Sequence, residues 1–161
     1  MLLHSQLVHL PVIEKNTGAV LGHVRNVRCR AGSARAEGIV YEDLSLLRRC
    51  RFLPWEAIAD IGAGGVMVNS AEGKAVKPAA VKSSPGKLYN AAGDYLGSIS
   101  NYLLDEKTGA VLGMELSESI SDDLKNGRKI IRNRGNIRQG ENHLVLMDTN
   151  EERRAGDDGL Y

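Results

Sequence analysis

The chain has 161 residues, a formal net charge of +1 and 42% hydrophobic residues, but only one Trp, one Phe and five Tyr. This length fits one domain or two small ones, and the core must be built mainly from aliphatic side chains. The nearly balanced charge argues against a strongly basic nucleic-acid-binding domain. The chain contains no run of about 18 apolar residues, so a membrane-spanning helix is not predicted.

The first residues and the cysteines both favour a cytoplasmic protein. The segment from Met1 to Ser5 has no charged stretch followed by an apolar one, so no signal peptide is predicted. Cys29 and Cys50 are too few for a disulfide framework and fit a reducing compartment. A single bridge between the two thiols is the alternative that the sequence leaves open.

Alternation of apolar and polar residues predicts strands in much of the first half of the chain. Gly18, the pair Gly32-Ser33 and the pair Glu42-Asp43 fall where turns are needed, and glycine adopts a positive φ there without strain. Pro54 favours the first position of a short helical turn within residues 53–62. The expected strands span residues 7–13, 20–30, 34–42, 47–53 and 65–69.

The second half predicts a similar series of strands. Residues 105–109 are expected to form a hairpin connection with a glycine near its end. Residues 121–127 predict one helical turn that stops at an Asn-Gly pair. The tail, residues 151–161, is charged and has little to bury, so we expect it to be disordered. The expected strands span residues 86–90, 94–105, 110–118, 127–133 and 143–148.

One pattern occurs twice in the chain. The segments Gly18 to Val27 and Gly93 to Tyr102 share the pattern Gly-x-x-Leu-Gly-x-(Val/Ile)-x-Asn-(Val/Tyr), 75 positions apart. The same offset carries Gly38 onto Gly113. An internal repeat of this kind predicts that each copy is one folding unit.

A shorter identity must be distinguished from this repeat. The hexapeptide Thr17 to Gly22 recurs as Thr108 to Gly113, which is 91 positions away. Extending that register would set Val24 against Glu115 and would exchange the buried and exposed faces of a strand. We therefore take the offset of 75 as the structural repeat.

The repeat divides the chain into two expected units, residues 1–72 and 85–150, with a linker at 73–84 before the tail at 151–161. Units this small bury only ~60% of the surface of the unfolded chain, so we expect them to pack on each other or on a second chain. Short strands with glycine turns predict an all-β sandwich or barrel. A closed sheet is favoured, because closure removes exposed edges and side chains alone fill a narrow barrel.

Several segments resemble the PRC-barrel family, which is named after the photosynthetic reaction-centre H subunit and includes the C-terminal domain of a ribosome maturation factor. In the first half the resemblance lies in Leu21 to Val27, Glu37 to Val40, Phe52 to Gly62 and Val66 to Val68. In the second half it lies in Leu96 to Asn101, Asp105 to Gly109, Val111 to Leu116 and Leu144 to Leu146, without the Pro-aromatic turn. The resemblance implies two tandem small PRC-type barrels with short helical turns, used for protein or RNA contact and without enzymatic activity.

No motif predicts a catalytic, cofactor-binding or metal site. Residues 61–65 are interpreted as a turn, because a dinucleotide-binding loop needs a third glycine where Met67 stands and a helix after it. The four histidines do not have the spacing of metal ligands. Asp122 and Asp123 are adjacent and point in different directions, which does not suit paired acid and base chemistry.

One segment, residues 127–138, is basic and contains no acid. Its interleaved Asn and Gly residues would let the backbone approach a phosphate, but it has no aromatic residue for base stacking. Two interpretations stay open, a solvated strand face and a surface that grips RNA or an acidic partner. The candidate residues are Arg128, Lys129, Arg132, Arg134 and Arg138.

Two further features are candidates for partner contact. Arg48, Arg49 and Arg51 form a similar, weaker basic cluster. Trp55 is the single tryptophan, and the family resemblance implies that it packs over a barrel mouth. The alternative is that Trp55 is partly exposed and anchors a partner.

The sequence thus predicts a non-catalytic, cytoplasmic adaptor that contacts a protein partner or another copy of itself. No cofactor and no small-molecule substrate are expected. The alternative is an RNA- or ribosome-associated factor that uses residues 127–138.

Overall fold

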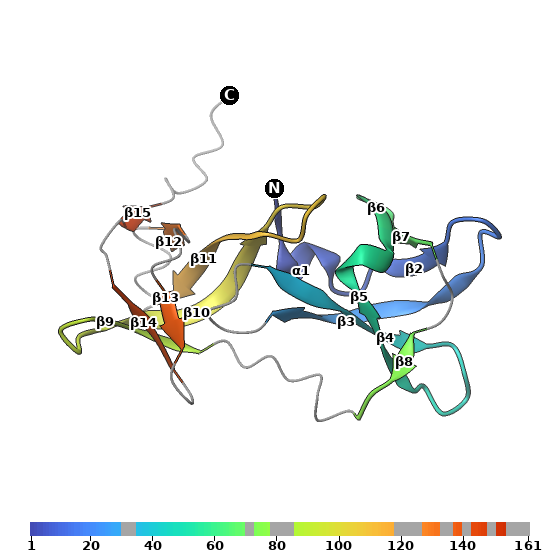
Figure 1. The fold of residues 1–161 in the computed structure, drawn as a ribbon, viewed down its shortest axis with the longest axis horizontal. Coiled ribbons are helices and arrows are strands. Elements are labelled where there is room, and N and C mark those ends of the chain that lie inside the picture. Colours follow the sequence, from blue (N-terminus) through green and yellow to red (C-terminus); the bar gives the residue numbers. More distant parts are fainter. Residues whose placement is uncertain are drawn as a thin grey trace.

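Two β-sheets make up the protein and lie side by side along its long axis, with the first sheet at the right of Figure 1. The computed structural model describes residues 1–29, 35–69, 73–77, 86–117, 127–132, 137–139, 143–147 and 151–153. Within these ranges the helical elements are α1 (His4–Leu7) and the short 3-10 helix η1 (Trp55–Ala57). The expected all-β fold is confirmed.

The first sheet has seven strands in the order β6-β7-β2-β3-β4-β5-β8. Neighbouring strands are antiparallel except β2 and β7, which run parallel. Val24, Ile39 and Leu53, from three neighbouring strands, are buried and supply part of the aliphatic core. The strands are β2 (Pro11–Glu14), β3 (Val20–Cys29), β4 (Ala36–Asp43), β5 (Cys50–Pro54), β6 (Ile58–Gly62), β7 (Gly65–Val68) and β8 (Lys74–Ala75).

The second sheet has the same strand order over six strands. Its path runs β13-β14-β9-β10-β11-β12, with β15 beyond β12, and β1 pairs with β10. Strands β14 and β9 run parallel, like β7 and β2 of the first sheet. The strands are β1 (Leu2–Leu3), β9 (Lys87–Asn90), β10 (Tyr95–Leu104), β11 (Val111–Ser117), β12 (Lys129–Arg132), β13 (Ile137–Gln139), β14 (His143–Leu146) and β15 (Glu151–Arg153).

The recurring asparagine forms the same bulge in both sheets. The pairing register shifts immediately before Asn26 in β3 and before Asn101 in β10. Asn26 Oδ1 accepts a hydrogen bond from the N–H of Val27 at 2.8 Å, and Asn101 Oδ1 accepts one from the N–H of Tyr102 at 3.1 Å. A bulge leaves one residue without a ladder partner, and the asparagine side chain binds the backbone beside it. This local structure explains why the pattern recurs 75 positions apart.

Two other pairs of residues occupy matching places in the two sheets. Leu21 and Leu96 each lie at a register shift and pack, half-buried, against the core. Gly38 and Gly113 both lie against a neighbouring strand, where an added Cβ would come within 2.0 Å and 2.7 Å of a backbone carbonyl oxygen. Close backbone approach therefore requires glycine at both positions.

The shorter identity has a different origin, because its two copies lie at different places in the fold. Gly18 lies in the turn between β2 and β3, whereas Gly109 lies in the turn between β10 and β11. Both glycines have a φ of 71°, and each donates its N–H to the carbonyl four residues earlier at 2.8 Å. The hexapeptide thus encodes one turn geometry used twice, and the hairpin predicted at residues 105–109 is confirmed.

The ends of the first expected unit differ from the prediction. A strand was expected at residues 7–13, but β2 begins at Pro11, because Leu7 ends α1 and residues 8–10 form the connection between the two elements. Strand β1 pairs with β10, so it belongs to the second sheet. Conversely, β8 lies within the expected linker and pairs with β5 of the first sheet. Local patterning does not reveal such pairings, because they join segments far apart in the sequence.

Three further expectations are corrected. Strand β5 starts at Cys50 rather than at residue 47, because Asp43 holds the preceding residues in a loop. The helical turn expected at residues 53–62 is confined to η1, and β6 follows it. Part of the tail that was expected to be disordered forms β15, since an open strand edge offers backbone partners whatever the side chains are. Residues 32–33, 78–85, 121–126 and 154–161 of the expected elements lie outside the described residues.

The N-terminal segment joins the two sheets. Figure 1 shows α1 between them, and Leu7 at its end is fully buried. Asn101 of β10 holds this segment, since its Nδ2 donates to Ser5 Oγ at 2.7 Å and its Oδ1 accepts from the Ser5 N–H at 3.1 Å. Buried residues of both sheets form a single hydrophobic cluster.

Candidate binding groove

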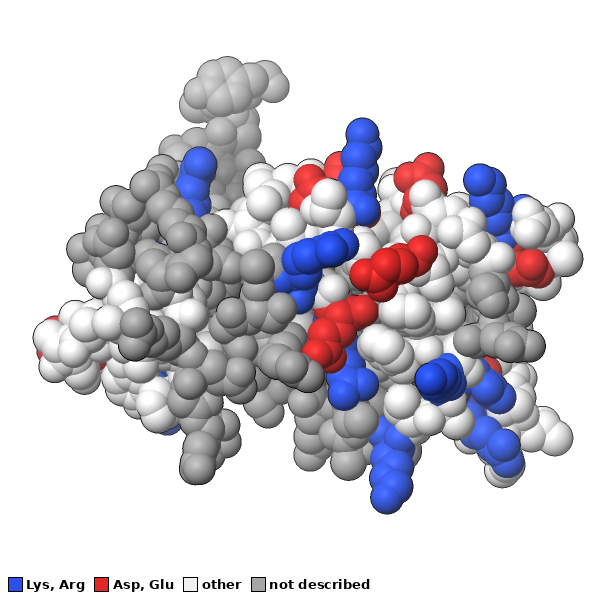
Figure 2. Space-filling view, in the orientation of Figure 1, with Lys and Arg blue, Asp and Glu red and all other residues white. Residues whose placement is uncertain are grey.

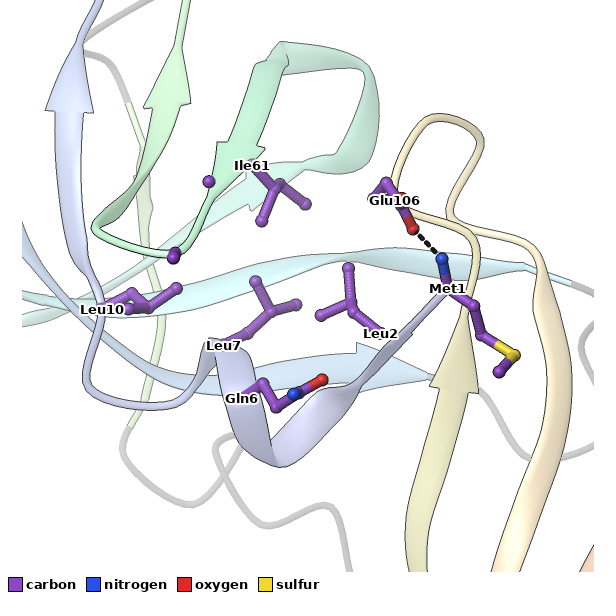
Figure 3. Close-up of a pocket in the computed structure, with 9 residues that line it drawn as sticks. Met1, Leu2, Gln6, Leu7, Leu10, Ile61 and Glu106 are labelled. Carbon is purple, nitrogen blue, oxygen red and sulfur yellow. Dashed lines mark hydrogen bonds and ion pairs between the residues drawn. The ribbon is translucent and has the colours of Figure 1, made fainter. Parts of the chain in front are cut away.

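A groove of about 380 Å³, lined mostly by residues with aliphatic side chains, opens where three segments that are distant in sequence meet. These segments are β1 with α1, the turn between β6 and β7, and the turn between β10 and β11. Figure 3 shows Leu2, Leu7 and Ile61 pointing towards one another across it. The lining residues are Met1, Leu2, Gln6, Leu7, Leu10, Ile61, Gly62, Ala63 and Glu106.

Among these residues, Gln6 and Glu106 carry the polar side chains. Gln6 Oε1 accepts a hydrogen bond from the N–H of Leu3 at 2.8 Å, so it is used within its own segment. The carboxylate of Glu106 accepts a hydrogen bond from the amino group of Met1 (Figure 3). This bond lowers the pKa of Glu106 below its ordinary value. Glu106 is therefore ionised at neutral pH, and its charge is paired with the Met1 ammonium at one end of the groove.

The hairpin that carries Glu106 is held by the residue before it. Asp105 Oδ1 accepts hydrogen bonds from the N–H of Lys107 at 3.0 Å, from the N–H of Thr108 at 2.8 Å and from Thr108 Oγ1 at 2.9 Å. The hydrogen bonds from Thr108 lower the pKa of Asp105. A side chain that binds its own following backbone fixes a turn, so Glu106 is presented on a defined loop.

The glycine-rich stretch forms the opposite wall. Gly62 pairs with Gly65 in the tight turn between β6 and β7, which confirms the interpretation of residues 61–65 as a turn. A Cβ at Gly62 would meet no atom within 4 Å. The small residues Gly62 and Ala63 leave this side of the groove open above Ile61.

Trp55 is not a surface anchor. Its side chain is only 3% exposed, and a Cβ on Gly109 of the second half would lie 2.8 Å from its ring. Trp55 Nε1 has no hydrogen-bond partner among the described residues. Its burial fits the interpretation as a structural residue, and the turn between β10 and β11 covers the ring. Trp55 thus contributes to contact within the chain.

The structure brings only part of the basic segment together. Arg128 lies 3.4 Å from a carboxylate oxygen of Glu115, whose side chain is 1% exposed, so this guanidinium neutralises a buried charge. Lys129 and Arg132 lie at the two ends of β12. Arg134 and the side chain of Arg138 lie outside the described residues.

The neighbouring strand adds charged positions of both signs beside this segment. Strand β15 (Glu151–Arg153) pairs with β12, and its register sets the three residues opposite Ile131, Ile130 and Lys129 in turn. The basic face of residues 127–138 therefore stays a prediction.

The cysteines are free thiols in the structure. Burial, with a smaller effect from the Glu37 charge, raises the pKa of Cys29 to about 12. A thiol reacts through its thiolate, so Cys29 is inert at neutral pH. Across the described ranges, no group of three or more metal-ligating side chains occurs. No helix in those ranges has the length and apolar character needed to cross a bilayer.

The sequence did not reveal the groove. Leu2, Leu7 and Leu10 are a visible apolar series, but an alternating pattern was read from residue 7 onward as one strand. In the structure Leu2 lies in β1, Leu7 ends α1 and is fully buried, and Leu10 lies after the helix. Glu106 carries no signal of its own, because it joins the groove only through the contact between the two halves.

Comparison with protein families gives one match, over residues 1–75, to the PRC-barrel domain. This part of the chain is a PRC-barrel domain. The PRC-barrel match includes all seven strands of the first sheet, and it also includes β1 and α1. Two walls of the groove therefore come from the PRC-barrel domain, while Glu106 comes from the second half. No curated protein matches the chain.

Proposed function

We propose that the protein is a non-catalytic adaptor that binds a partner protein through the groove, and that its second half is a second PRC-barrel domain. The observation that carries the adaptor proposal is a groove lined mostly by aliphatic side chains, with a carboxylate at its end that is paired with the Met1 amino group of the same chain. The equal strand order of the two sheets and the matching bulges support the second domain.

The groove fits one bulky apolar side chain of a partner, next to a Lys or Arg that faces Glu106. Interfaces are anchored by a few apolar side chains that fill pockets, with polar contacts at the rim. The half-buried Leu2 and Ile61 supply the apolar contacts, with the fully buried Leu7 behind them, and Glu106 supplies the opposite charge once it leaves the Met1 amino group. A partner ammonium or guanidinium would replace the present contact of Glu106 with the amino group.

The chemistry of the groove supports binding without catalysis. General acid and base catalysis needs groups whose pKa lies near the working pH. The pKa of Glu106 is shifted down, away from neutrality, and Gln6 does not titrate. A fixed carboxylate in an aliphatic setting recognises charge and does not transfer protons.

A cytoplasmic location is part of the same proposal. Cys29 and Cys50 are half-buried and free, which fits a compartment that keeps thiols reduced. Extracellular small domains usually join such cysteines in bridges.

Selection of random linear peptides against the full chain tests the adaptor proposal. The enriched peptides should share a bulky apolar residue beside Lys or Arg. Ile61→Asp should weaken binding of a selected peptide by about tenfold or more, because burying an aliphatic side chain is worth roughly 1.5–3 kcal/mol. Leu112→Asp is the matched control, since Leu112 is exposed on β11 outside the groove.

Glu106→Gln should remove the preference for Lys or Arg while leaving the apolar preference in place. Peptides that bind Ile61→Asp as well as the parent protein would contradict the proposal. Salt-sensitive RNA binding that Arg132→Gln weakens would support the RNA-associated alternative instead. For five phosphate contacts on single-stranded RNA, the slope of log K against log salt should be about −3.5.

A further inference from the structure

The loop between β4 and β5 exposes three leucines. Leu44 is 60% exposed, Leu46 is 104% exposed and Leu47 is 71% exposed. The loop projects beyond the end of the first sheet, on the side where β8 lies (Figure 1). Grouped exposed apolar residues mark interaction sites, whereas single ones do not need a special explanation.

The loop has a defined shape that holds the leucines outward. Asp43 Oδ1 accepts hydrogen bonds from the Ser45 N–H at 3.1 Å and from the Arg49 N–H at 3.0 Å. Asp43 Oδ2 accepts one from Arg51 Nε at 2.9 Å. The hydrogen bond from Ser45 Oγ has the largest effect, and together with the other contacts it lowers the pKa of Asp43 to about 2. Arg48 has a φ of 44°, which is uncommon for a residue with a side chain.

Basic side chains surround the base of this apolar tip. Arg48 and Arg49 follow the leucines directly and are exposed. The Val76 N–H donates to the Cys50 carbonyl at 2.9 Å, which brings the exposed Lys77 beside them. Figure 2 shows Lys and Arg side chains gathered over the end of the sheet that β4, β5 and β8 occupy in Figure 1.

The nearby acids do not cancel this charge. Asp43 is hydrogen-bonded to Arg51. Glu42 lies 3.5 Å from Arg25 and 3.8 Å from Arg48. Beyond these ion pairs, the exposed Arg49, Lys77 and Lys74 of β8 contribute further positive charges. The loop therefore combines a protruding aliphatic tip with a net positive base.

We propose that the loop of residues 44–49 is a membrane-surface anchor, which inserts its leucines between the headgroups of an anionic bilayer while its basic base contacts the lipid phosphates. The tip is convex and comprises six residues, whereas a stable protein interface needs roughly 800 Å² from each partner. Apolar insertion combined with basic residues is the pairing of signals that holds peripheral proteins at anionic leaflets. This anchor lies apart from the groove and would bring the adaptor to a membrane surface.

Flotation of the full chain with vesicles of phosphatidylcholine, with and without phosphatidylglycerol, tests the proposal. The parent protein should float with the anionic vesicles only, and added salt should reduce binding because charges at the surface are screened. Leu46→Ser should weaken binding by about tenfold or more. Arg48→Gln and Arg49→Gln should each weaken it roughly fivefold, the factor for about 1 kcal/mol per basic residue.

Matched controls are available on the same chain. Leu112→Ser removes an exposed leucine of β11, and Lys107→Gln removes an exposed cation of the hairpin at residues 105–109. Both should bind vesicles like the parent protein, and so should the groove variant Ile61→Asp. The last result separates a failure of the anchor from a failure of the groove.

A Leu46→Trp variant reports insertion directly, because its emission should shift to the blue on anionic vesicles while Trp55 stays buried. Absence of binding by the parent protein, or equal binding by Leu46→Ser, overturns the proposal. Self-association that Leu46→Ser abolishes, without any vesicle binding, overturns it as well and assigns the loop to a second copy.

Discussion

Replacing Gly109 by alanine perturbs the contact between the two halves of the chain, and Gly18 offers a matched control. Both glycines lie in the sequence Thr-Gly-Ala-Val-Leu-Gly and both have a φ of 71°. Their surroundings differ. A Cβ at Gly18 would meet no atom within 4 Å, whereas a Cβ at Gly109 would lie 2.8 Å from ring atoms of Trp55.

The expected losses follow from these two environments. The left-handed conformation is roughly 1–2 kcal/mol less favourable for a residue with a side chain, so Gly18→Ala should lower the free energy of unfolding by that amount. Gly109→Ala should have the same conformational effect, and its Cβ would also crowd the ring of Trp55. The ring of Trp55 is 3% exposed and has little room to move, and overpacking costs typically about 1–3 kcal/mol. We expect a total loss of ~2–5 kcal/mol.

Urea unfolding followed by tryptophan emission and by far-ultraviolet circular dichroism measures both losses. Trp55 is the single tryptophan, so its emission reports on the contact itself. Coincident transitions from the two probes are needed before the free energies are compared. Equal losses for the two variants would refute the packing of Trp55 on Gly109.

Three other predictions concern single sites. Gly38→Val and Gly113→Val should each lower the free energy of unfolding by about 1–3 kcal/mol or more. The loss should be larger for Gly38→Val, because its Cβ would lie 2.0 Å from a carbonyl oxygen. A loss at only one of the two sites would contradict their equivalence. Leu21→Ala and Leu96→Ala should each lower the free energy of unfolding, measured by thermal unfolding, by less than ~2 kcal/mol. Both leucines are half-buried, and losses of about 2–5 kcal/mol apply to fully buried leucines. A larger loss would mean that the two leucines are core residues. The pKa of Asp43 is about 2 in the folded protein and ~3.9 in the unfolded chain. Asp43 therefore stabilises the protein above pH ~3.9, and this contribution is lost as the pH falls towards 2. An NMR titration midpoint near ~3.9 would contradict the hydrogen bonds of the loop.

The sequence predicted the parts of the fold that depend on local patterns. Strands β3 and β10 were expected within one or two residues of their ends, because each is long and alternating. The recurring asparagine was identified as part of the repeat, but the bulge beside it was not predicted. The turn at residues 61–65 was also predicted, because glycines at that spacing had no following helix.

The remaining features depend on contacts between distant segments. The pairing of β1 with β10 has no counterpart in the local pattern. The burial of Trp55 depends on Gly109, and the groove needs Glu106 to approach Ile61. Leu47 was expected at the start of a strand. The sequence does not show that Asp43 binds the backbone of Ser45 and Arg49 and so holds this segment as a loop.

Chemical-shift mapping of a selected peptide on the ¹⁵N-labelled full chain tests the central claim of a protein-binding groove most directly. The claim predicts that the perturbed amides cluster at Leu2, Leu7, Leu10, Ile61 and Glu106, which come from three separate segments. Perturbations confined to β12 and its basic residues, with the groove unchanged, would contradict it.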